Sequence, residues 1–289
     1  MQITSLLRKG LVVGIIFLFV GTGIIPSMAQ DIEKPSLPTS RGHWLYVGGS
    51  GPGNYTRIQD AIDNASNGDT VYVYDDSSPY NEYVKINTSI HLVGENQKTT
   101  VIDGQGLIAV SLKADAITFT GFTVQNTGFL SFGLYVFSNN NTIRGNIFSN
   151  NFLSDIYLTT SNNNTITENT FSNSAIGICL SESNDTTITR NIITKNHGYG
   201  IALANSRRNL ISQNNILDNG KYDAFFTRDI GIFPLSNHWD ANYWGRPYLL
   251  PKRIHGQLIL FENHPRIALP LVNFDWFPAR EPYNIGGMR

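Results

Sequence analysis

Apolar and polar positions recur with a fixed period through the middle of the chain, between Leu134 and Asn219. Each period holds an apolar pair separated by one residue, and then an isoleucine with an asparagine three positions after it. The period is 22 or 23 residues, which is typical of solenoids. Because alternating apolar positions predict strands, we expect each period to form one coil of three short parallel strands joined by polar bends. The apolar pairs are Leu134 with Val136, Ile156 with Leu158, Ile178 with Leu180, and Ile201 with Leu203.

Residues one period apart are expected to stack on one another, because neighbouring coils lie about 4.8 Å apart. The isoleucines would form a buried column, and the asparagines a ladder that satisfies buried backbone groups at a bend. A leucine-rich repeat has a similar period, but these units are rich in Asn, Thr, Ser and Gly and poor in helix formers. The two columns are Ile143, Ile166, Ile188 and Ile211, and Asn146, Asn169, Asn191 and Asn214.

These repeats resemble those of right-handed parallel β-helix proteins, the architecture of pectate lyases, polygalacturonases and NosD proteins, over roughly residues 70–235. The resemblance implies an all-β fold, a right-handed parallel β-helix solenoid. It says little about function, because the repeat residues are structural. The Asn-Tyr-Trp-Gly segment at residues 242–245 and the proline-rich end are similar to the closing segment of secreted archaeal β-helix proteins.

Both ends of the solenoid are expected to carry a cap, since an open stack would expose its core and its strand edges. Residues 43–47 predict a first strand, and Ile58, Ala61, Ile62 and Ala65 fall at helical spacing. This short amphipathic helix is the expected N-terminal cap. Residues 236–289, rich in Trp, Tyr and Pro, are the expected C-terminal aromatic cap, with sugar binding by these aromatic residues as the alternative.

Residues 1–29 predict a signal peptide, with Arg8 and Lys9 ahead of an apolar run and small residues before Gln30. An uncleaved membrane anchor is the alternative, although an apolar run of about 16 residues is short for a spanning helix. Residues 30–42 would be a linker, and residues 43–235 the β-helix with its N-terminal cap. We expect a secreted or cell-surface protein, which meets a membrane only if the first segment is uncleaved.

The composition limits the classes of partner and of covalent modification that we expect. Charged residues make up 15% of the chain, its net charge is -1 at pH 7, and it has no basic run, so we expect no nucleic-acid partner. Cys179 is the only cysteine, so no intramolecular disulfide can form. In an exported protein, Asn-x-Ser/Thr sequons on surface bends are candidate glycosylation sites. They begin at Asn54, Asn64, Asn87, Asn140, Asn163 and Asn184.

Strand alternation also assigns candidate binding residues. If Ile156 points inward, its neighbours Asp155 and Tyr157 point outward. Tyr135 occupies the position of Tyr157 one period earlier, and Phe137 follows it by two residues. We therefore expect Tyr135, Tyr157 and Phe137 to form a flat aromatic strip for sugar rings, beside which Asp155 accepts hydrogen bonds from sugar hydroxyls. The alternative is that a loop or the C-terminal tail covers the strip.

No catalytic residue, metal site or cofactor is assigned. Glycoside hydrolases need two carboxylates roughly 5–9.5 Å apart, whereas Asp155 and Asp223 would be three coils, or about 14 Å, apart. Copper(I) favours thiolate, thioether or imidazole ligands. Cys179 stands alone, however, and Met288 is the one methionine after the leader.

The favoured function is that of an exported, non-catalytic protein that binds a polysaccharide or cell-surface glycan, or that builds the cell surface. One alternative is a polysaccharide lyase or glycoside hydrolase with degenerate motifs, since Asn196-His197-Gly198 only partly matches the Gly-His-Gly of polygalacturonases. The other alternative is a NosD-like periplasmic accessory protein associated with copper. Binding and turnover on a panel of polysaccharides would distinguish the three.

Overall fold

The structure is a computed structural model that describes residues 42–230, 236–261 and 267–286. The chain divides into two units, Met1–Thr39 and Ser40–Arg289, and the fold below is that of the second. The expected signal peptide lies outside the described residues, as does the expected linker except for Gly42. Within the described ranges, no helix is both long and apolar enough to span a membrane.

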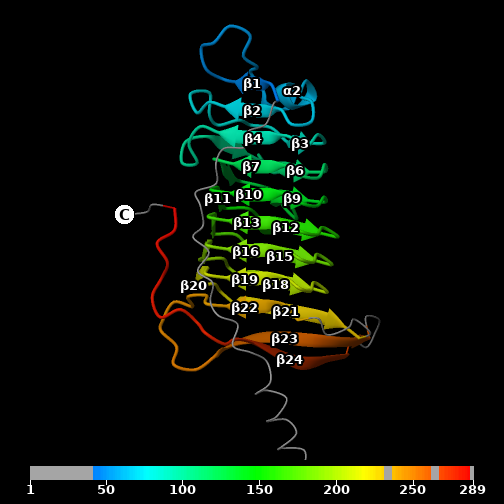
Figure 1. Ribbon diagram of the computed structural model, residues 1–289, viewed down its shortest axis with the longest axis vertical. Coiled ribbons are helices and arrows are strands. Elements are labelled where there is room, and N and C mark those ends of the chain that lie inside the picture. The colour runs from blue at the N-terminus through cyan, green and yellow to red at the C-terminus, as the bar shows by residue number, and fades with distance from the viewer. Residues whose placement is uncertain (1–41, 231–235, 262–266, 287–289) are drawn as a thin grey trace, which may run out of the picture. The chain divides into compact units, whose positions relative to one another are not determined.

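The second unit is a right-handed parallel β-solenoid of about eight turns, which confirms the predicted fold. A typical turn gives one short strand to each of three parallel stacks. Figure 1 shows the first and third stacks side by side. The first stack contains β1 (Trp44–Val47), β2 (Thr70–Val73), β4 (His91–Gly94), β7 (Thr118–Thr120), β10 (Thr142–Arg144), β13 (Thr165–Thr167), β16 (Thr187–Thr189), β19 (Leu210–Ser212) and β22 (His238–Asp240). The second contains β5 (Val101–Asp103), β8 (Thr123–Gln125), β11 (Ile147–Ser149), β14 (Thr170–Ser172), β17 (Ile192–Thr194) and β20 (Asn215–Leu217). The third contains β3 (Val84–Ile86), β6 (Val110–Leu112), β9 (Phe132–Val136), β12 (Ser154–Thr159), β15 (Ile176–Ser181), β18 (Tyr199–Ala204) and β21 (Tyr222–Asp229).

The core is built from side chains stacked in register. Ile143 pairs with Ile166, Ile166 with Ile188, and Ile188 with Ile211, and all four side chains are fully buried. The predicted isoleucine column is therefore confirmed. Larger rings continue it in both directions, because Phe119 precedes Ile143 and Trp239 follows Ile211 in the same register.

The predicted asparagine ladder is also present, at the bend between the first and second stacks. The Oδ1 atom of Asn169 accepts the backbone N–H and the side-chain amide of Asn146, both at 3.0 Å. Its Nδ2 lies 2.9 Å from the carbonyl oxygen of Ile143 and 3.1 Å from Oδ1 of Asn191. The same pattern recurs from Asn191 to Asn214 and on to Asn242. All of these asparagines are buried, so the ladder supplies partners that water cannot.

A helix lies at the N-terminal end of the solenoid, where α2 (Ile58–Asp63) packs beside β1, β2 and β3 (Figure 1). Ile58, Ala61 and Ile62 are buried in the core, as their spacing predicted. The carboxylate of Glu82 accepts the backbone N–H groups of Ile58 at 2.8 Å and Gln59 at 3.1 Å. It therefore satisfies two donors at the helix N-terminus, which have no partner within the helix.

At the other end, β23 (Lys252–Phe261) and β24 (Ile267–Asp275) form an antiparallel pair beyond the last turn. β23 pairs with β21, and β24 meets β22 at Trp239. Trp239 and Trp244 are buried, whereas Trp276 is 52% exposed. Because β22 is in register with β19, the stacking continues past residue 235, the boundary expected from the sequence.

Candidate functional site

The outward face of the third stack is the surface for which the sequence predicted ligand binding. Strand register places one residue of each turn in a central column that runs along this face. The column consists of Lys85, Ser111, Tyr135, Tyr157, Cys179, Ala202, Phe225 and His255. The predicted outward position of Tyr135 and Tyr157 on adjacent turns is therefore confirmed, and both side chains are half-buried.

Tyr135 and Tyr157 form a cluster with Phe132, which we call the upper aromatic stack. The Phe132 ring lies 4.7 Å from that of Tyr157 at an angle of 23°, and 5.7 Å from that of Tyr135 at 20°. Rings this close and this nearly parallel cover one another's faces. The rings are thus stacked on one another and do not form the flat strip that we expected. A sugar ring would meet edges, hydroxyls and the faces at the ends of the stack.

Tyr199, Tyr222 and Phe225 form a second cluster on the same face, the lower aromatic stack. Its ring centroids are 5.4–6.2 Å apart, with interplanar angles of 15–30°. The imidazole of His255 lies 5.1 Å from the Tyr222 ring. This cluster was not predicted from the sequence, although a signal exists. Phe132, Tyr199 and Tyr222 each stand two residues before an inward apolar residue, which places all three in one flanking column.

Small side chains separate the two aromatic stacks. Cys179 and Ala202 lie between Tyr157 and Phe225 in the central column. Beside them, Ser181 and Ala204 follow Thr159 in the column two residues farther along each strand. Phe137 itself is 55% exposed, and within the described residues it makes no ring pair with either tyrosine. The face therefore has bulky aromatic groups at two levels. Between them lie these four small side chains and, in the flanking column of Phe132 and Tyr199, Ile176.

Asp155 does not point outward, and this prediction is wrong. Its side chain is fully buried, and its Oδ1 accepts hydrogen bonds from Ser174 Oγ at 2.5 Å and Asn151 Nδ2 at 2.8 Å. Burial raises the pKa of its carboxyl to about 8, against the opposing effect of these hydrogen bonds. A residue in this position cannot contact a glycan on the surface.

Backbone geometry explains the error. Ser154, Asp155 and Ile156 are all buried, so the strict alternation of an ideal strand fails at the start of β12. The matching position on the next turn is Gly177, where an added Cβ would lie only 2.9 Å from Nδ2 of Asn196. This position thus faces a polar column at the corner between the second and third stacks. Asp223 resembles Asp155, because it also accepts from the asparagine four residues before it.

The sequons differ in accessibility. Asn64, Asn87, Asn140 and Asn163 are exposed. The half-buried Asn54 and Asn184 use Nδ2, the atom that would carry a glycan, as a donor to Gly48 O at 2.6 Å and to Asn162 Oδ1 at 3.0 Å. Among the exposed four, Nδ2 of Asn64 donates to Asp60 O at 2.8 Å, and Nδ2 of Asn163 donates to Asn140 Oδ1 at 2.6 Å. Glycosylation stays a prediction, and the exposed Asn87 and Asn140 are the better candidates.

Comparison with known proteins identifies the family. The family model described as "Periplasmic copper-binding protein (NosD)" matches residues 62–241, more than half of the chain. The chain belongs to this family. The NosD match covers the solenoid from α2 to the end of β22 and includes both aromatic stacks. Comparison with curated proteins gives no match.

Solved structures with low similarity to this NosD-family chain include three pectin methylesterases. One, in complex with hexasaccharide VII, has 16% identity and a TM-score of 0.33 over 70% of this chain and 71% of its own. The carrot enzyme has 13% identity and a TM-score of 0.35 over 73% and 82%. The Erwinia chrysanthemi enzyme has 13% and 0.35 over 88% and 92%. Similarity at this level carries no argument about activity.

The copper in the NosD description can be tested against the side chains. No group of three or more His, Cys, Asp and Glu side chains within the described ranges is arranged to hold a metal ion. Burial raises the pKa of the Cys179 thiol to about 12, which disfavours the thiolate that a metal would bind. The described part of the chain therefore does not fit a copper site.

Proposed function

We propose that this NosD-family protein is exported and binds carbohydrate, without cleaving it, on the outward face of its third stack. The observation that carries the proposal is the pair of aromatic stacks on this face, separated by four small side chains and Ile176. Aromatic rings offer apolar surface to the C–H groups of a sugar, and tyrosine hydroxyls can bond its hydroxyls. The periplasmic location in the family description supports export.

The spacing of the two stacks suits a short oligosaccharide. Tyr157 and Phe225 belong to the same column three turns apart, which is about 14 Å at the spacing of parallel strands. Phe132, from the preceding turn, covers one face of the Tyr157 ring. The next strand of the third stack, β15, contains no aromatic residue. A glycan lying along the column would contact Tyr157 at one end and the lower aromatic stack at the other.

The chemistry of the face favours binding over cleavage. The central column and the flanking columns of Phe132 and Phe137 are fully described from β9 to β18, and no side chain in them carries a carboxylate there. Hydrolysis of a glycosidic bond by the usual route requires two carboxylates on either side of it. Asp155, the earlier candidate, is buried behind the face. The tyrosine hydroxyls remain as donors, and burial raises the pKa of Tyr135, which keeps its hydroxyl protonated.

The test is binding of a panel of neutral and acidic oligosaccharides to the purified protein by calorimetry. Tyr157→Ala and Phe225→Ala should each weaken binding by about tenfold, since losing an aromatic contact costs about 1–2 kcal/mol. Trp276→Ala is the matched control, because it removes an exposed aromatic ring from the C-terminal segment. Circular dichroism should show an intact fold for all three variants, since none of these rings belongs to the core.

Three results would contradict the proposal. The first is that no glycan binds the wild type, and the second is that the double variant of Tyr157 and Phe225 binds as well as the wild type. The third is loss of binding in Trp276→Ala alone, which would assign sugar binding to the C-terminal aromatic residues. Cleavage products from the wild type would instead support the lyase or hydrolase alternative.

A further inference from the structure

A cavity of about 240 Å³ lies at the corner where the third stack turns into the first, near the C-terminal end of the solenoid. Its walls come from the residues after β18, the end of β21, the residues before β22, and β24. One water molecule needs only about 10–15 Å³ of such space. The cavity is therefore large enough for a small ligand, and two arginines, Arg207 and Arg228, line it.

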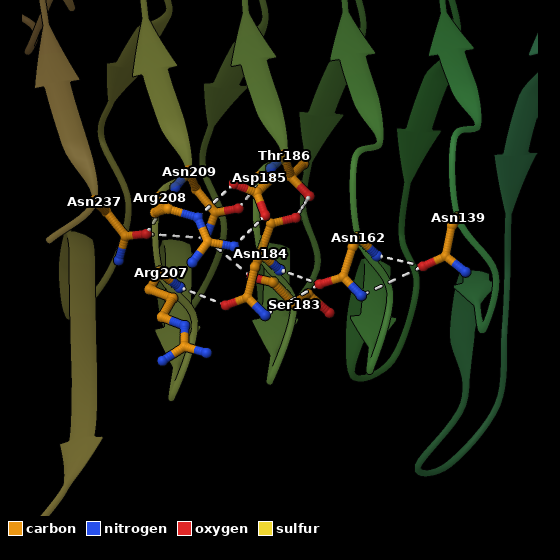
Figure 2. Close-up of polar contacts among 10 residues, drawn as sticks. All are labelled: Asn139, Asn162, Ser183, Asn184, Asp185, Thr186, Arg207, Arg208, Asn209 and Asn237. Atoms are coloured by element: carbon orange, nitrogen blue, oxygen red, sulfur yellow. Dashed lines mark hydrogen bonds and ion pairs between the residues drawn. The ribbon is translucent and has the colours of Figure 1, made fainter. Parts of the chain in front are cut away.

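Arg207 reaches the cavity because it interrupts a ladder of half-buried corner residues, shown in Figure 2. On successive turns, Asn162 donates its backbone N–H to Asn139 Oδ1 at 2.8 Å, and Asn184 donates its own to Asn162 Oδ1 at 3.1 Å. Arg207 repeats this backbone contact with Asn184 Oδ1 at 3.0 Å, but its side chain extends away from the ladder (Figure 2). Its guanidinium has no hydrogen-bond or ion-pair partner among the described residues. The next residue, Arg208, differs, because it pairs with Asp185 at 2.5 Å.

Arg228 reaches the cavity because β21 extends beyond the point at which β18 ends. The two strands pair in register as far as Ala204 and Thr227, and β21 continues to Asp229. Nε of Arg228 is buried and has no hydrogen-bond partner in the described part of the chain. The carboxylate of the neighbouring Asp229 is held by Asn205 Nδ2 at 2.5 Å. No described residue that lines the cavity carries a carboxylate.

The amide groups around the cavity are used to hold its walls together. Asn237 Nδ2 donates to the carbonyl oxygen of Ser206 at 2.8 Å, and Asn273 Nδ2 donates to that of Asn237 at 3.0 Å. The hydroxyl of Ser206 donates to the carbonyl oxygen of Ala204 at 2.9 Å. These hydrogen bonds connect the segments at the end of β18, before β22 and in β24, so the wall amides already have partners within the protein. The strong donors left for a ligand are the two guanidinium groups.

We propose that this cavity binds a compact oxyanion, the carboxylate, sulfate or phosphate group of a small molecule, between Arg207 and Arg228. Guanidinium groups form paired hydrogen bonds with such oxyanions. Arg207 and Arg228 are half-buried, and the buried Nε of Arg228 lacks an acceptor, which an anion would supply. The protein as a whole does not attract anions, because its net charge is -1. Anion binding would therefore depend on the two arginines. Neither arginine belongs to the aromatic face, so the proposal is independent of the proposed function.

The test is calorimetric titration of the purified protein with inorganic phosphate, sulfate, galacturonate and, as the neutral probe, galactose, all at one ionic strength. The three anions should bind and galactose should not. R207Q and R228Q should each weaken anion binding at least about tenfold, since each removes one of the paired contacts. R208Q is the matched control: it removes the adjacent arginine, which pairs with Asp185 outside the cavity, and it should bind as the wild type does.

The probes also distinguish two sources of the oxyanion. Galacturonate binding much tighter than phosphate or sulfate would assign the site to acidic sugars, and equal binding would assign it to free anions. The proposal is overturned if no anion binds the wild type at millimolar concentration, if R207Q and R228Q both bind normally, or if R208Q loses binding equally. Neutral-glycan binding at the aromatic face should be unchanged in both cavity variants, so failure of one proposal is distinguishable from failure of the other.

Discussion

The asparagine ladder offers the sharpest test of what holds the solenoid together, and Asn169→Ala is the change that probes it. The Asn169 side chain accepts two hydrogen bonds from Asn146, both at 3.0 Å. It also donates toward the carbonyl oxygens of Ile143 and Thr167 and toward Asn191 Oδ1, at 2.9–3.1 Å. Because every one of these contacts ends at Asn169, a single substitution removes them all.

The loss of stability in Asn169→Ala depends on which hydrogen-bonding groups are left without a partner. In the variant, the side-chain amide of Asn146 keeps the carbonyl oxygens of Phe119 and Arg144 as acceptors. The Oδ1 atom of Asn191 keeps the backbone N–H of Asn169. The backbone N–H of Asn146, however, loses the acceptor that Asn169 provides at a position fully shielded from water. We expect a loss of about 2–3 kcal/mol in the free energy of unfolding, the cost of one orphaned buried donor plus a cavity.

The matched control is Asn162→Ala in the corner ladder of Figure 2. Oδ1 of Asn162 accepts from the backbone and side chain of Asn184 at 3.1 and 3.0 Å, much as Asn169 accepts from Asn146. Asn162 is only half-buried, so water can replace the lost acceptor, and we expect a loss below about 1 kcal/mol. The exposed Asn163 is a poorer control because its φ is +57°, where alanine adds about 1 kcal/mol of strain.

The measurement is urea unfolding followed by circular dichroism, with unfolding slopes compared between variants so that a change in cooperativity is not mistaken for a change in stability. A solenoid can also unfold in segments, so hydrogen exchange at the turns of β10 and β13 should show where protection is lost. Equal losses for Asn169→Ala and Asn162→Ala would refute the reasoning, because the difference between them rests on burial alone.

Two further predictions concern buried carboxyl groups. Because the pKa of Asp155 is about 8 in the folded protein and near 4 in an unfolded chain, the folded state holds the extra proton between these values. Stability should therefore fall as pH rises from about 4 to 8, by up to about 1.4 kcal/mol per unit. Asp155→Asn should flatten this dependence in urea titrations, and an unchanged slope would contradict the assignment. At the end of the ladder, Asp275 Oδ2 accepts from Asn242 N at 3.0 Å, Asn242 Nδ2 at 3.1 Å and Trp244 Nε1 at 3.0 Å. Asp275→Ala should lower the free energy of unfolding by about 2–3 kcal/mol, and Asp275→Asn, which keeps an acceptor oxygen, by less; similar losses would show that packing matters more than the acceptor.

Much of the fold could be predicted because the solenoid repeats its own local rules. A period of 22 or 23 residues identifies the coil, and the recurring isoleucine and asparagine identify what it buries. Each turn packs on its sequence neighbours, so a column such as Ile166 over Ile188 follows directly from counting residues. The helical spacing of Ile58, Ala61 and Ile62 was equally informative, because their burial depends on one face of one short helix.

The candidate site was predicted only in part. The outward positions of Tyr135 and Tyr157 follow from alternation, but the stacking of their rings on Phe132 does not, because ring orientation depends on neighbouring turns. Asp155 was misplaced because the backbone turns at the start of β12, where three consecutive residues are buried. The lower aromatic stack depends on Tyr222 and Phe225, which belong to a turn whose repeat pattern is already weak in the sequence.

The sequence by itself determined the period, the strand columns and the residues of the buried ladder, because these depend on contacts between adjacent, similar turns. Only the tertiary structure decided where the pattern breaks and what the breaks create. Arg207 and Arg228 carry no shared motif, yet the end of a ladder and the extension of β21 bring both to one cavity. Asp275 terminates the asparagine ladder from a strand outside the repeat. Such sites are formed by segments that are not related by the repeat. Their chemistry therefore depends on how the non-repeating parts of the chain pack against the solenoid.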